Sequence, residues 1–164
     1  MRNYKGIFKI IQESRWFSSS MRIQLLKWGG YRIGKSTVIR GQCYFTGNYV
    51  KIGEGCFVNN FCKFYSHQDD TSYIELEDNV VVAMNVTFCT HTHDIQGKER
   101  RASEYTLTKP IKVCRGTWIG ANVVVLPGVK IGGGCVIAAG SVVTRDCKSN
   151  SLYAGVPARF VRKL

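Results

Sequence analysis

One six-residue rhythm runs without a slip through residues 113–148. Each hexad begins with an aliphatic residue, and a small or β-branched residue follows four places later. The aliphatic positions are Val113, Ile119, Val125, Ile131, Ile137 and Val143, and the small ones are Thr117, Val123, Val129, Cys135, Ser141 and Cys147. A period of six is neither the 3.6 of a helix nor the 2 of a strand, so it predicts the stacked coils of a solenoid.

Glycine accompanies this rhythm at two places in the hexad. It directly follows the aliphatic residue at Gly120 and Gly132, and glycine or asparagine recurs three places after the aliphatic residue. Both placements favour turns that need a positive φ.

The same rhythm begins at Ile33 and is interrupted twice before residue 113. Residues 65–72 are expected to form a loop pushed out of the coil, because Asp70 falls in a slot that would face the core. Residues 94–110 form a longer, polar stretch without periodicity. A loop of this length inside a compact repeat is typical of a functional segment.

Both ends of the chain depart from the rhythm. Residues 1–30 are expected to form a helical cap, with a second helix over 21–28 that begins after Ser20 and stops at Gly29 and Gly30. A first amphipathic helix is indicated by the spacing of Tyr4, Ile7, Phe8 and Ile11. Such a helix can cover the open end of the solenoid or lie on a membrane surface.

The tail, residues 149–164, is expected to leave the solenoid of residues 31–148. Pro157 is placed to start a short helix that ends in basic residues.

Composition narrows the domain number, the expected compartment and the state of the cysteines. A chain of 164 residues with 45% hydrophobic residues suits one domain. No apolar run approaches a membrane span and the N-terminus carries charges where a signal peptide is apolar, so the expected compartment is the cytoplasm. Most of the seven cysteines occupy small-residue slots and no CxxC pair occurs, so they are interpreted as core residues in a reduced protein.

The net charge of +12 calls for an anionic partner: nucleic acid, a membrane surface or a phosphate-rich cofactor. The basic residues are scattered, with local clusters only at residues 98–101 and 159–163, and no nucleic-acid motif accompanies them. Nucleic acid is therefore not expected as a partner.

Two of the three histidines, His91 and His93, stand directly before the longer loop. In an extended segment they would lie on the same side. They could be metal ligands with His67 as a third partner. Alternatively, one histidine could act as a general base, with Asp94 or Glu104 fixing its tautomer.

The run WIGANVVVLPGVKIGGGCVIAAGSVVTRD followed by YAGVPARFVRKL resembles the hexapeptide-repeat O-acetyltransferases, which include galactoside, maltose and nodulation-factor acetyltransferases. The resemblance implies an all-β fold, a left-handed parallel β-helix with a short N-terminal helical cap and a short C-terminal helix. It also implies a homotrimer with acetyl-CoA bound between subunits and no metal.

The resemblance further implies roles for individual residues. His93 occupies the place of the catalytic histidine, and the backbone N–H of Ala121 that of the oxyanion donor. Residues implied near the acceptor are Asn59, Asp69, Asp70, His91 and Trp118. Residues implied along the CoA donor are Ala139, Thr144, Arg145, Arg159 and Arg162, and CoA phosphates would also explain the positive charge.

The expected function is acetyl transfer to a sugar hydroxyl, with His93 as general base and no covalent intermediate through Cys89. The N-terminal cap does not align with the longer helical domain of the galactoside enzymes, which favours a surface-polysaccharide acceptor; another short acyl donor stays open. The alternatives are a zinc-dependent, carbonic-anhydrase-like lyase using His67, His91 and His93, and a binding solenoid without catalysis.

Overall fold

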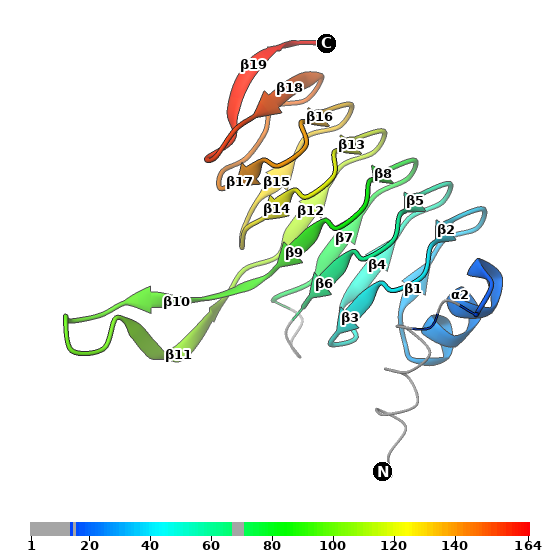
Figure 1. Ribbon diagram of the computed structural model, residues 1–164, viewed down its shortest axis with the longest axis horizontal. Helices are drawn as coiled ribbons and strands as arrows, with labels where there is room; N and C mark the ends of the chain where they lie inside the picture. Colours follow the sequence, from blue (N-terminus) through cyan, green and yellow to red (C-terminus); the bar gives the residue numbers. More distant parts are fainter. Residues whose placement is uncertain (1–13, 15, 67–70) are drawn as a thin grey trace.

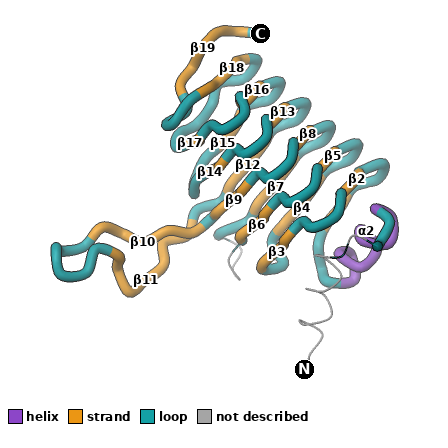
Figure 2. Tube along the Cα trace, viewed as in Figure 1, coloured by secondary structure: helices purple, strands orange, loops and turns teal. Residues whose placement is uncertain are grey.

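The chain folds into a parallel β-solenoid whose coils stack from the N-terminal to the C-terminal end (Figure 1). The structure is a computed structural model and describes residue 14, residues 16–66 and residues 71–164. Each coil contributes one short strand to each of three parallel sheets, here called sheets A, B and C, joined by turns at three corners (Figure 2). The solenoid predicted from the hexads is therefore confirmed.

The strands of each sheet follow one another at coil intervals. Sheet A contains β1 (Arg32–Ile33), β4 (Val50–Ile52), β7 (Ile74–Leu76), β12 (Ile111–Val113) and β15 (Lys130–Ile131). Sheet B contains β2 (Val38–Ile39), β5 (Phe57–Val58), β8 (Val81–Val82), β13 (Trp118–Ile119), β16 (Val136–Ile137), β18 (Ser151–Ala154) and β19 (Arg159–Lys163). Sheet C contains β3 (Tyr44–Thr46), β6 (Lys63–Tyr65), β9 (Thr87–Cys89), β14 (Val124–Val125) and β17 (Val142–Val143).

The core is a column of hexad side chains inside the coils. The aliphatic positions and the small-residue slots that follow them are buried. Five of the slots hold cysteines: Cys43, Cys56, Cys62, Cys135 and Cys147. Under sheet C the rings of Phe45, Phe64 and Phe88 stack from coil to coil, with centroids 4.7 and 4.9 Å apart. Because every coil repeats the same interior, each stabilises only its neighbours and the fold can be read from a short period.

The turns at the corners explain the glycine and asparagine pattern. Only one of the two positions in the hexad has the expected positive φ. Positions three places after the aliphatic residue take a positive φ, as at Asn122 (59°) and Gly128 (82°). Gly120 does not: a Cβ there would lie 2.6 Å from the backbone nitrogen of Ala139 in the next coil. The expectation of a positive φ directly after the aliphatic residue was therefore wrong. Glycine is required at this position because there is no space for a side chain.

One helix, α2 (Ser19–Trp28), covers the first coil. Its N-cap is Ser18, whose Oγ accepts a hydrogen bond from the backbone N–H of Met21, so the helix begins earlier than the predicted cap at Ser20. It ends at Gly29 as predicted. The predicted helix over residues 4–11 lies outside the described residues. No helix in the described part of the chain is long and apolar enough to cross a membrane.

The C-terminal tail forms two strands, which corrects the expected helix. β18 pairs in parallel with β16 and so continues sheet B, and β19 returns antiparallel to β18. Pro157 follows a cis peptide bond in the turn between them. The alternation that buries Ser151 and Tyr153 fits a strand, so the tail completes the end of the solenoid.

The outer faces of sheets A and B differ in chemistry. Sheet A carries a charged row in register: Arg32, Lys51, Glu75, Lys112 and Lys130. Sheet B carries an apolar row in register: Val38, Phe57, Val81, Trp118, Val136 and Leu152. An exposed apolar row on one sheet favours contact with another protein surface.

Candidate active site

The two histidines lie on an arm that projects from the solenoid between β9 and β12 (Figure 1). The arm is an antiparallel pair of β10 (His91–Ile95) and β11 (Ala102–Thr108). The stretch expected as an irregular loop over residues 94–110 is therefore largely strand. Its register shifts between His93 and Ile95, so the backbone is irregular beside His93.

The side chain of His93 is held by the opposite strand of the arm. Its Nδ1 lies 2.9 Å from the carbonyl oxygen of Ser103. A carbonyl oxygen can only accept, so Nδ1 carries the proton and the Nε2 of a neutral ring keeps its lone pair. The geometry thus gives His93 the tautomer that a general base needs.

Neither carboxylate considered for this orienting role makes the contact. Asp94 accepts a hydrogen bond from the backbone N–H of Ile95, and Glu104 pairs with Arg100 at 2.8 Å. The Oγ of Ser103 instead fixes the arm by accepting from Asp94 N at 3.1 Å and donating to Tyr105 O at 2.6 Å. Sequence reasoning missed Ser103 because its carbonyl, which every residue has, carries the contact.

His91 sits closer to the solenoid. Its Nδ1 is buried without a hydrogen-bond partner in the described part of the chain, and its ring meets the ring of Tyr65 edge to face at 6.5 Å. The Sγ of Cys89 donates to the carbonyl oxygen of His91 at 3.3 Å. These contacts place His91 at the base of the arm and leave His93 exposed farther along it.

The corner between sheets B and C places the backbone N–H of Ala121 between two hydrogen-bonded neighbours. The N–H groups of Gly120 and Asn122 donate to carbonyls of adjacent coils, at 2.8 and 3.0 Å. In the portion described, the N–H of Ala121 between them makes no hydrogen bond. Ala139 occupies the same place one coil later, and the Gly140 N–H donates to the carbonyl of Ala121 at 2.8 Å. Ala121 therefore offers a fixed N–H, as an oxyanion donor requires.

Other predicted residues lie along the same side. Trp118 is 54% exposed on the outer face of sheet B. Asn59 follows β5 two coils before Gly120, and its Oδ1 accepts a hydrogen bond from Asn60 N at 2.8 Å. Arg159 and Arg162 are exposed on β19 at the end of sheet B. These residues form one edge of the solenoid.

The remaining predicted residues are separated from that edge. Thr144 and Arg145 follow β17 at the corner between sheets C and A. The arm with His93 also leaves at that corner, because it follows β9, so sheet C lies between His93 and Ala121 within one chain. Asp69 and Asp70 lie outside the described residues.

The residues considered as metal ligands are only partly described. Among the residues that the structure describes, no group of three histidine, cysteine or acidic side chains could hold a metal ion. The proposed third ligand, His67, lies outside them. Burial raises the pKa of the Cys56, Cys135 and Cys147 thiols, the last to about 12, which disfavours the thiolate that a metal would require.

Known proteins agree with this architecture. The family model for the bacterial transferase hexapeptide (six repeats) matches residues 110–145. The chain is 42% identical over 119 residues to a candidate acetyltransferase of Schizosaccharomyces pombe, covering 72% of this chain but only 55% of that protein. The chain thus spans about half the length of this relative.

Two further matches cover more of the other protein. Galactoside O-acetyltransferase of Escherichia coli K12 is 34% identical over 144 residues, which is 87% of this chain and 68% of that one. The crystal structure of a hexapeptide-repeat acetyltransferase from Vibrio cholerae, complexed with acetyl-CoA, has a TM-score of 0.84 at 31% identity, covering 97% and 84% of the two chains. The chain therefore belongs to the hexapeptide-repeat acetyltransferase family.

Proposed function

We propose that this protein transfers an acetyl group from acetyl-CoA to a sugar hydroxyl, with His93 as the general base. The observation that carries the proposal is the contact between His93 Nδ1 and the carbonyl oxygen of Ser103, since it leaves Nε2 free to accept a proton. The donor is proposed from the relative of Vibrio cholerae, which is complexed with acetyl-CoA, and the sugar acceptor from the name of the Escherichia coli relative.

The reaction proceeds by direct transfer. Nε2 of His93 removes the proton of the acceptor hydroxyl as its oxygen attacks the thioester carbonyl carbon. The thioester oxygen becomes negatively charged, and the N–H of Ala121 stabilises it; one such donor is worth roughly 3 kcal/mol. Collapse breaks the carbon–sulfur bond, and the proton held on His93 passes to the departing CoA thiolate. A covalent route through Cys89 is disfavoured, because its thiol donates to the carbonyl of His91.

The site is proposed to form between subunits of a homotrimer. His93 and Ala121 lie at different corners of one chain, separated by sheet C, so a neighbouring copy would bring one to the other. The apolar row on sheet B, including Val81 at 40% and Trp118 at 54% exposure, supplies a surface for that contact. Sedimentation of the purified protein measures the assembly, and Val81→Lys should dissociate it.

The acceptor side is proposed to involve Asn59, His91 and Trp118, and the donor side Ala139, Thr144, Arg145, Arg159 and Arg162. We further propose a surface-polysaccharide intermediate as the acceptor and the cytoplasm as the compartment. All seven cysteines are free, which fits a reducing compartment.

Incubation with labelled acetyl-CoA and a panel of glycan and nucleotide-sugar acceptors tests the function. His93→Ala should reduce transfer by about 10²–10⁴-fold while CoA still binds. Thr92→Ala is the control, because Thr92 is exposed on the same strand and has no proposed role; it should retain the activity of the wild type. Equal transfer by wild type and His93→Ala would contradict the assignment, and activity lost on chelation would favour the metal alternative.

A further inference from the structure

The positive charge of this protein is concentrated near its N-terminal end. Residues 14–53 contain seven lysines and arginines and no aspartate or glutamate: Arg15, Arg22, Lys27, Arg32, Lys35, Arg40 and Lys51. The basic residues are little denser here than elsewhere, but no acidic residue offsets them. CoA phosphates bound near β19 would not reach this segment, because it lies at the other end of the solenoid (Figure 1).

Four exposed cations of this segment lie on α2 and the first coil. Lys27, Arg32, Lys35 and Arg40 are all exposed. Within the described residues, Lys27, Arg32 and Lys35 form no ion pair, whereas Lys51 pairs with Glu75 at 2.7 Å. The end of the solenoid is therefore an uncompensated cationic surface that favours an anionic partner.

Large apolar side chains stand among these cations. Trp16 is 95% exposed, Trp28 74% and Met21 52%. On α2, Arg22 and Leu26 turn toward the first coil and are buried. Met21 and Trp28 are seven residues apart and so share the opposite, outward face of the helix.

The position of Trp16 is fixed by a buried cation. The Nη2 of Arg22 donates to the carbonyl oxygens of Ser14 and Phe17, at 2.9 and 3.1 Å, and its Nη1 donates to Ile39 O at 3.1 Å. These bonds hold the backbone on both sides of Trp16 against the first coil. The exposed indole is therefore presented by an anchored segment.

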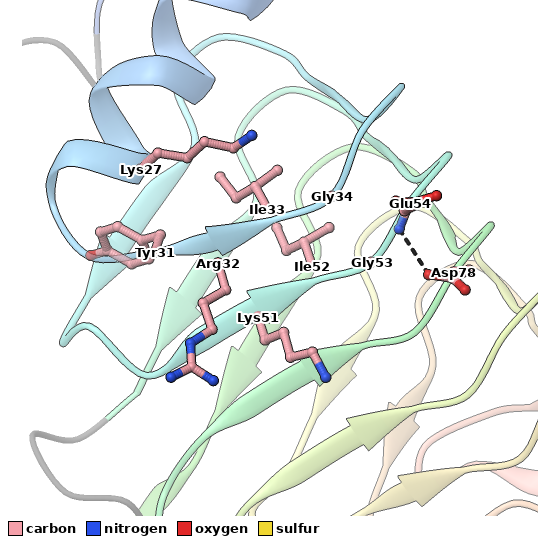
Figure 3. A pocket seen from close by; sticks show the side chains of 10 residues that line it. All are labelled: Lys27, Tyr31, Arg32, Ile33, Gly34, Lys51, Ile52, Gly53, Glu54 and Asp78. Carbon is pink, nitrogen blue, oxygen red and sulfur yellow. Dashed lines mark hydrogen bonds between the residues drawn. The ribbon is translucent and has the colours of Figure 1, made fainter.

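A small-ligand pocket does not account for this surface. A hollow of about 450 Å³ lies beside α2 and β1 (Figure 3). Lys27, Arg32 and Lys51 all line it, but the Lys27 side chain extends in a different direction from those of Arg32 and Lys51 (Figure 3). The cations do not converge on one anion, so an extended anionic surface suits them better.

We propose that this end of the solenoid docks on an anionic membrane surface. Trp16, Met21 and Trp28 would enter the boundary between head groups and acyl chains, and Lys27, Arg32 and Lys35 would lie near lipid phosphates. A second copy of this end would bring like charges together. Single-stranded nucleic acid also pairs cations with aromatic rings, but the exposed Met21, which shares a helix face with Trp28, favours an apolar boundary. The docking is independent of the acetyl transfer proposed above.

Co-sedimentation of the full chain with phosphatidylcholine vesicles, with and without phosphatidylglycerol, tests the docking. The protein should bind the anionic vesicles only and dissociate as salt is raised. Each lysine near the surface is worth about fivefold in binding, so Lys27→Ala/Lys35→Ala should weaken it roughly 25-fold. The matched control on the arm, Lys98→Ala/Arg101→Ala, removes the same charge and should leave binding unchanged.

The tryptophans give a second readout. Their fluorescence should shift to the blue on anionic vesicles, and Trp16→Ser/Trp28→Ser should abolish the shift and weaken binding while the melting temperature is unchanged, because both side chains are exposed. Equal binding to neutral and anionic vesicles, equal loss in the arm control, or preference for an oligonucleotide over vesicles would each overturn the proposal.

Discussion

The Nδ1 of His93 lies 2.9 Å from the carbonyl oxygen of Ser103, across the two strands of the arm. The residue that orients the proposed base is thus carried by the return strand of an excursion, ten residues further along the chain. Its hydroxyl ties together the backbone of both strands at the same point. The arm is therefore a positioning device as well as a carrier of the histidine.

Ser103→Ala should lower kcat while leaving KM for both substrates unchanged. The substitution retains the carbonyl that orients His93 but releases Asp94 N and Tyr105 O from the hydroxyl. Loosened placement of a base costs roughly tenfold or more in rate. Steady-state kinetics measure this, with Leu107→Ala as the control, because Leu107 is exposed on β11 and pairs with Thr92. A raised KM with unchanged kcat would assign Ser103 to binding instead.

Arg159→Ala/Arg162→Ala should raise KM for acetyl-CoA about tenfold or more, because charge-assisted bonds to phosphate contribute about 1.5–3 kcal/mol. With S-acetylpantetheine, which lacks the nucleotide phosphates, the variant and the wild type should behave alike. Lys163→Ala on the same strand is the control. If both donors are affected equally, these arginines support the fold of β19 and do not bind phosphate.

Gly120→Ala should destabilise the protein by about 3 kcal/mol or more, because its Cβ would lie 2.6 Å from Ala139 N and 2.9 Å from Ala139 Cα. Both atoms belong to the backbone of the next coil and cannot move aside alone. Gly97→Ala is the control, since nothing lies within 4 Å of its added Cβ. Urea denaturation of both variants gives the comparison, and equal midpoints would show that the coils can separate at this corner.

Glu75→Gln should make the free energy of unfolding depend less on pH in the acid range. Lys51 and Lys112 hold the pKa of the Glu75 carboxyl below its usual range, chiefly through the hydrogen bond from Lys51. A lowered native pKa gives stabilisation that is present above the unfolded value, about 4.3, and is lost as pH falls through the native value. Since Lys51 is exposed, the effect should not exceed about 1 kcal/mol.

Urea unfolding of wild type and Glu75→Gln between about pH 3 and pH 7 measures this difference. Glu99→Gln serves as the control because its carboxylate is 89% exposed and lies 3.8 Å from Lys98. Parallel curves for wild type and Glu75→Gln would mean that the charged row on sheet A does not contribute to acid stability.

The hexads made the solenoid predictable, because every buried aliphatic residue recurs at a fixed interval that local sequence reveals. The helix expected in the tail was wrong because Pro157 suits a turn between strands as well as the first turn of a helix. The pairing of Leu152 with Val136 of β16, sixteen residues earlier, makes the segment a strand. The sequence predicts His93 as the base, and that role stays a prediction; the Ser103 carbonyl that holds its ring could not be predicted, since every residue has a backbone carbonyl.

Because the coils stack at a regular spacing, the number of coils between two parts of the chain determines the distance between them. Hydrogen-bonded neighbouring strands are about 4.8 Å apart, so the arm, which leaves the third coil, stands roughly 10 Å beyond the first coil that α2 covers. Removing or adding one whole coil before the arm would shift the histidines by one such step without changing their surroundings. The number of coils before the arm therefore sets the distance between the proposed reaction and the surface on which the helix-covered end is proposed to dock.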